Sequence, residues 1–169
     1  MIKILLFSIP LLFLGCNAFN GGSNFFEITV DGQTFAWSGN SMTSIDGKAM
    51  YLSNQGSVCG GKNAIQMWEG NAGLYDFYCA CFVPDGEGSF SVGDPNSGCA
   101  NMVIDGPWSY SLISGVETSN GNIATPIVTI THEGMNVIKG TISGTIAGSN
   151  QNGTFSEKSI SGSFKLRKM

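Results

Sequence analysis

The chain has 169 residues, with 8 basic and 12 acidic side chains and a formal net charge of −4. This acidic balance lacks the basic footprint that nucleic-acid binding requires, and it does not favour electrostatic binding to a membrane. Glycine is abundant, with 24 residues, and only 12% of the residues are charged. Such a composition is typical of β-structure with many turns.

The N-terminus predicts export. Lys3 supplies a positive charge, and residues 4–14 are almost entirely apolar. This stretch is shorter than the roughly 20 residues that a membrane-spanning helix requires. A basic start followed by a short apolar run is the pattern of a secretory signal peptide, which we expect at residues 1–15.

The end of this segment resembles the lipobox of bacterial lipoproteins, in which a small residue precedes an acylated cysteine. Gly15 and Cys16 match that pattern. The resemblance implies that residues 16–24 form a lipidated N-terminus and flexible tether, anchored in the membrane by acyl chains such as palmitate. Asn17 replaces the aspartate that resembles an inner-membrane retention signal, which favours the outer membrane. The alternative is ordinary signal-peptide cleavage after Ala18.

Hairpin signals open the remainder of the chain. Residues 26–30 and 33–37 alternate apolar and polar side chains on either side of Asp-Gly at 31–32. This arrangement is a strong sequence signal for a β-hairpin. A second Asp-Gly at 46–47 repeats the pattern.

Three later segments also predict strands. Residues 74–83 are apolar on both faces, which indicates a strand in the middle of a sheet or between two layers. Residues 137–147 and 159–167 each alternate with period two, which predicts half-buried strands. The inward-facing residues of these two strands would be Ile138, Gly140, Ile142, Gly144 and Ile146, then Ile160, Gly162, Phe164 and Leu166.

Residues 25–169 are therefore expected to form a single all-β domain of nine or ten strands, without helices. An antiparallel β-sandwich stapled by disulfides is the preferred architecture. A lipocalin-like β-barrel is the alternative.

Several short motifs resemble a family of small all-β lipoproteins from Bacteroidetes-type bacteria, whose function is uncharacterised. They are the hairpin ITVDGQTFAW, the strand GSFSVG, and the tail VIKGTISGTIAG followed by NGTFSEKSISGSFKL. The resemblance covers most of the chain after the signal peptide. It implies a fold and a location, and it implies no catalytic residue.

The cysteines besides Cys16 are even in number, which predicts disulfides in an exported chain. A bridge between Cys79 and Cys81 is disfavoured, because residues i and i+2 of a strand lie about 6.5–7 Å apart. Two pairings stay open: Cys59–Cys79 with Cys81–Cys99, or Cys59–Cys81 with Cys79–Cys99. The spacing fits neither the paired-cysteine knuckles of zinc sites nor a Cys-x-x-Cys redox motif.

Acidic residues suggest two further chemistries. Asp85, Glu87 and Asp94 lie in a glycine-rich region and are weak candidates for calcium ligands. The same acids could serve a carboxylate-dependent hydrolase. His132 is the only histidine, so no multi-histidine metal site is expected, and its place beside a turn suits an ordinary solvated side chain.

Aromatic side chains could form a platform for a sugar ring or a protein partner. Aromatic residues in strands are also common in cores. Trp108, beside Pro107 in a turn, is the one for which exposure is most expected. The four candidates are Trp37, Trp68, Trp108 and Tyr110.

Together these features predict a non-catalytic binding protein at the cell envelope, facing the periplasm or the cell surface. Its partner would be a glycan or a protein, and no cofactor or nucleic acid is expected. One alternative is an immunity or inhibitor protein whose acidic surface meets a basic toxin. The other is the hydrolase described above.

Overall fold

The computed structural model describes residues 24–39, 47–52, 63–71, 74–93, 102–108, 110–149 and 152–168. The described residues form eleven strands and contain no helix long and apolar enough to cross a membrane. The strands are β1 (Asn24–Val30), β2 (Gln33–Gly39), β3 (Gly47–Leu52), β4 (Asn63–Asn71), β5 (Leu74–Val83), β6 (Gly88–Ser91), β7 (Met102–Asp105), β8 (Leu112–Ile113), β9 (Ile127–Glu133), β10 (Val137–Ser149) and β11 (Phe155–Lys168).

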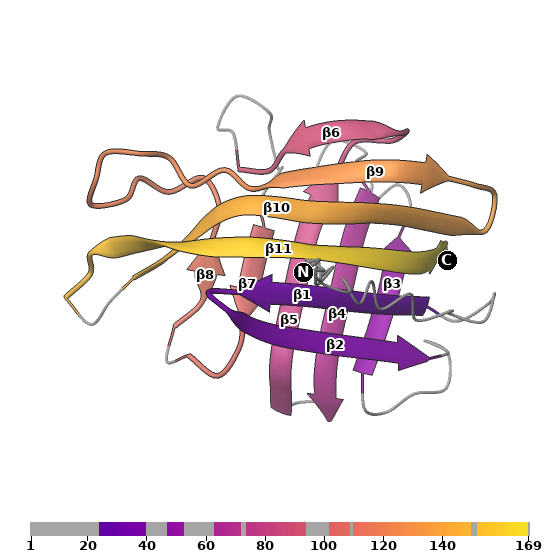
Figure 1. Cartoon of the computed structure of the whole chain (residues 1–169), viewed down its shortest axis with the longest axis horizontal. Helices are drawn as coiled ribbons and strands as arrows, with labels where there is room; N and C mark the ends of the chain where they lie inside the picture. Colours follow the sequence, from indigo (N-terminus) through magenta and orange to yellow (C-terminus); the bar gives the residue numbers. More distant parts are fainter. Residues whose placement is uncertain are drawn as a thin grey trace, which may run out of the picture.

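The strands lie in two layers that cross each other (Figure 1). One layer has the order β2-β1-β11-β10-β9-β6, and β3, β4, β5 and β7 run crosswise behind it. Hydrogen bonds connect both layers into one continuous sheet. Crosswise layers of this kind share a core formed by their inner faces. The predicted all-β sandwich is confirmed, except that β11 pairs with β3 in parallel rather than antiparallel fashion.

Strand β10 belongs to both layers because it bends in its middle. Its first half pairs with β9, whereas Ala147 and Gly148 pair with β8 in the other layer. Between these parts, Gly144 has a φ of +118°, a conformation that L side chains rarely adopt. The expected inward row is therefore interrupted: Ile138, Gly140, Ile142 and Ile146 are buried, but Gly144 is exposed.

Strand β11 follows its predicted alternation more closely, with Ile160, Phe164 and Leu166 buried. The hairpin expected around residues 31–32 is also present, because β1 and β2 pair along their whole length. Strand β5 lies between β4 and β7, in the middle of its layer, as its two apolar faces predicted.

No disulfide involves the cysteines that the structure describes. Cys79 and Cys81 are free thiols, buried on the core face of β5. The expected partners Cys59 and Cys99 lie outside the described residues, as does Cys16. Burial raises the pKa of the Cys81 thiol to about 12. The physical reason for the absence is the register, because the neighbours opposite these two cysteines are not cysteines but Ile65, Met67, Met102 and Ile104.

Candidate functional site

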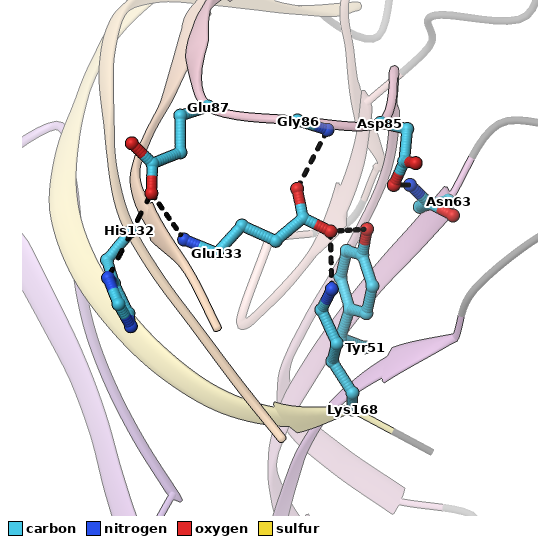
Figure 2. Close-up of polar contacts among 8 residues, drawn as sticks. All are labelled: Tyr51, Asn63, Asp85, Gly86, Glu87, His132, Glu133 and Lys168. Atoms are coloured by element: carbon cyan, nitrogen blue, oxygen red, sulfur yellow. Dashed lines mark hydrogen bonds and ion pairs between the residues drawn. The ribbon is translucent and has the colours of Figure 1, made fainter. Parts of the chain in front are cut away.

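An open cleft of about 510 Å³ lies at one end of the domain. Three segments that are distant in sequence form it: the turn between β5 and β6, the turn between β9 and β10, and the last residue of β11. Figure 2 shows how their side chains converge. The lining residues are Asp85, Gly86, Glu87, Glu133, Gly134, Met135 and Lys168.

Backbone hydrogen bonds hold these segments together. The N–H of Gly134 donates to the carbonyl of Val137 at 2.8 Å, which closes the turn between β9 and β10. The N–H of Lys168 donates to the carbonyl of Asn136 at 3.1 Å, which fixes the end of β11 against that turn. Gly86 has a φ of +95°, so glycine suits the sharp turn between β5 and β6.

Glu133 is the centre of the polar network. Its Oε1 accepts hydrogen bonds from Lys168 Nζ at 2.5 Å and from the Tyr51 hydroxyl at 3.4 Å. Its Oε2 accepts a hydrogen bond from the backbone N–H of Gly86 at 2.7 Å. Because only 12% of this side chain is exposed, the three donors offset the cost of removing its charge from water.

Tyr51 on β3 contacts both Glu133 and Lys168 of this network. Its ring is buried, and Lys168 Nζ lies 5.4 Å from the ring centroid, within cation–π distance. Burial raises the pKa of Tyr51 well above its usual range, and the negative charges of Glu133 and Asp85 raise it further. The hydroxyl therefore stays protonated and acts as a hydrogen-bond donor to Glu133.

Two further carboxylates lie at the rim. Glu87 Oε1 accepts a hydrogen bond from the backbone N–H of Glu133 at 2.9 Å and lies 3.9 Å from His132 Nδ1. Asp85 Oδ1 accepts a hydrogen bond from the side-chain amide of Asn63 at 3.0 Å. Both rim carboxylates are exposed, so they retain acceptor capacity for a ligand.

The charges of the cleft are unequal. Asp85, Glu87 and Glu133 contribute three carboxylates, and Lys168 is the ammonium group that neutralises one of them. Glu133 is saturated by its donors and holds the frame. The cleft can therefore accept hydrogen bonds or attract positive charge through Asp85 and Glu87, next to the exposed side chain of Met135.

The structure brings together two of the three acids predicted as calcium or hydrolase residues. Asp85 and Glu87 share the cleft, whereas Asp94 lies outside the described residues. Within the described part of the chain, no three His, Cys, Asp or Glu side chains are grouped so that they could hold a metal ion. His132 is an exposed side chain beside Glu87, close to the turn where it was expected.

The four predicted aromatic residues do not form one platform. Trp68 lies on the outer face of β4, because its neighbour Met67 points into the core. Trp37, Trp108 and Tyr110 instead pack against the core. Trp108, expected to be exposed, is half-buried, and its ring packs edge-on against Phe35 at 5.8 Å between centroids.

Sequence reasoning missed the residues at the centre of the cleft. Tyr51, Glu133 and Lys168 are separated by at least 35 positions from one another, and the structure brings them together through long-range strand pairing. The only local signal was the turn at 133–136. Neither the charge of Lys168 nor its place at the end of a strand indicates a partner.

Comparison with models of known protein families, with curated proteins and with solved structures finds no match to this chain.

Proposed function

We propose that this protein is a lipid-anchored binding protein of the bacterial outer membrane, and that the cleft around Glu133 receives its ligand. The observation that carries the binding role is the rigid frame of the cleft. Donors from β3, the β5–β6 turn and the end of β11 fix the Glu133 carboxylate, while Asp85 and Glu87 remain exposed at the rim. Preorganised acceptors lower the entropic cost of binding.

The ligand class follows from the acceptors. A partner must present hydrogen-bond donors or positive charge to Asp85 and Glu87. Glycan hydroxyls meet the first requirement, and basic side chains of a protein meet the second. The exposed Met135 side chain adds an apolar contact at the edge, where 94% of the residue is accessible. An immunity protein that meets a basic toxin would use the same acceptors.

The location rests on the N-terminal sequence. The lipobox-like Gly15-Cys16 pair and the resemblance to small all-β lipoproteins support anchoring through acyl chains on Cys16. Anchoring of this kind relies on apolar burial rather than on surface charge, which agrees with the acidic composition.

The test uses the full chain against an array of envelope oligosaccharides and an array of lysine- and arginine-rich peptides. Asp85→Asn and Glu87→Gln remove charge without changing shape, and we expect each to weaken binding by about tenfold. Asp76→Asn on β5 is the matched control, because this exposed acid is not among the residues lining the cleft.

The outcomes separate the candidates. Binding to oligosaccharides alone would identify a glycan receptor, whereas binding to basic peptides alone would identify a protein partner. Release of shorter sugars from a bound oligosaccharide would show the hydrolase instead. The proposal fails if Asp85→Asn and Glu87→Gln bind as well as the unchanged protein.

A further inference from the structure

A second polar surface lies on the outer face of β10 and β11, next to the cleft around Glu133. Lys139, Lys165 and Arg167 gather there, three of the eight basic residues of an acidic chain. Buried Ile138, Phe164 and Leu166 alternate with them, which places the basic side chains on the side facing away from the core. We call these three residues the basic row.

The register of β10 and β11 places the charges of the basic row where they destabilise the folded sheet. Lys139 on β10 is directly opposite Lys165 on β11, and Arg167 is two residues farther along the same face. Like charges directly opposite each other in an antiparallel pair destabilise a sheet. A folding requirement therefore does not explain why these positions carry positive charge.

The neighbouring strands do not neutralise these charges. Phe25 of β1 is opposite Lys165, and His132 of β9 is opposite Lys139. The ion pairs among the described residues join His132 with Glu87, Lys158 with Asp31, and Lys168 with Glu133, so none includes the basic row. Glu27 is the nearest acid along β1, but its register partner is Ser163.

The surface is also hollowed beside the basic row. A cleft of about 310 Å³ is lined by Asn24, Asn136, Val137, Lys165 and Arg167. Its charged lining residues are both cationic, and Asn136 adds an exposed amide. An arginine fork can hold two oxygens of one anion, while lysine supplies a point charge.

We propose that the cleft between Lys165 and Arg167 binds a phosphate group, with Lys139 adding charge at its side. The phosphate would offset the repulsion within the basic row. Its source would be either a free phosphate or phosphate ester, or the headgroup of a phospholipid. This cleft shares no lining residue with the cleft around Glu133, although Asn136 and Arg167 directly adjoin Met135 and Lys168 in sequence. The proposal does not rest on the function assigned to that cleft.

The place of Asn24 in the cleft favours a lipid headgroup as the source of the phosphate. Asn24, the first residue of β1, lines the phosphate cleft. If Cys16 carries the anchor, residues 16–23 span at most roughly 28 Å between the membrane and this cleft. The phosphate cleft would then stay within reach of the lipid headgroups.

The experiment titrates the full chain with inorganic phosphate in one arm and with short-chain phosphatidylglycerol, kept below its critical micelle concentration, in the other. Isothermal calorimetry measures affinity, and thermal unfolding reports stabilisation by the bound ligand. We expect Lys165→Gln and Arg167→Gln each to lower affinity about tenfold or more. Lys158→Gln removes one positive charge from β11 outside the basic row, where Lys158 pairs with Asp31, and is expected to bind normally.

Lys139→Gln gives a second, independent readout. It removes half of the opposed lysine pair, so we expect a higher midpoint of thermal unfolding without phosphate and weaker phosphate binding. Affinity for inorganic phosphate assigns a free anion, and affinity for phosphatidylglycerol alone assigns a lipid headgroup. The proposal is overturned if neither probe binds, or if Lys158→Gln weakens binding as much as Arg167→Gln.

Discussion

Replacing Glu133 with glutamine tests the polar network most directly. The glutamine keeps the shape of the side chain but loses its charge, so the ion pair with Lys168 disappears. One end of the new amide is a donor, and it must face either Lys168 Nζ or the N–H of Gly86, which are themselves donors. The variant therefore leaves a charge and at least one polar group poorly paired.

The expected cost follows from the exposure of the pair. The side chains of Lys168 and Glu133 are 24% and 12% exposed, so the pair lies between a surface and a buried salt bridge. Unpairing a donor costs about 1–3 kcal/mol, and the lost ion pair adds to this. We expect Glu133→Gln to lower the free energy of unfolding by about 2–4 kcal/mol.

Urea denaturation, followed by tryptophan fluorescence and circular dichroism, measures this loss. Glu27→Gln on β1 is the matched control, because it removes the same charge from an exposed position. A double-mutant cycle with Lys168→Met isolates the coupling between the two side chains, expected at about 1–3 kcal/mol. A loss below about 0.5 kcal/mol, within the usual range for surface substitutions, would refute the reasoning.

Four further predictions concern other parts of the chain. Gly140→Ala would place a Cβ against the backbone oxygen of Thr129 on β9 and the ring of Phe164, so it is expected to cost about 1–3 kcal/mol in urea denaturation, whereas no loss would contradict this contact. The pKa of the Tyr51 hydroxyl is higher in the folded protein than its usual value of about 10 in the unfolded chain, so the unfolded chain loses this proton first as pH rises. The protein should therefore lose stability above pH about 10. Tyr51→Phe should reduce this loss when stability is measured in alkaline titrations. Cys79 and Cys81 should resist alkylation until the protein unfolds, because both are buried and protonated, and rapid labelling of the folded chain would argue against their placement. Intact mass of membrane-extracted protein should show acyl chains on Cys16, and Cys16→Ser should release the protein in soluble form.

Several of the elements that sequence alone predicted have an unbroken period of two. Strand β11 keeps its alternation, and the residues around Asp-Gly at 31–32 form the expected hairpin. Strand β10 departs at Gly144, because the strand bends there to pair with β8, and a bend between layers leaves no mark on hydrophobic periodicity. Glycine at position 144 is compatible both with a continuous strand and with a bend.

The site was less predictable because it depends on long-range pairing. Asp85 and Glu87 were identified as candidates, since acids beside glycines form a local pattern. Glu133 and Lys168 were not, because their contact depends on how β9, β10 and β11 align. The cysteine prediction rested on parity and compartment, and it could not foresee that methionine and isoleucine would be the neighbours of Cys79 and Cys81.

The pairing of β1 with β11 has a consequence for the order of folding. Residues 25–30 align with residues 160–165, so the first strand described pairs with the last one. A chain that emerges N-terminus first from the ribosome would present the β1–β2 hairpin long before β11 arrives, and an isolated hairpin is at best marginally stable in water. Contacts between such distant segments also slow folding. During that interval the apolar side of β1 stays open to solvent and to other chains, so a chaperone would have its greatest effect on this hairpin.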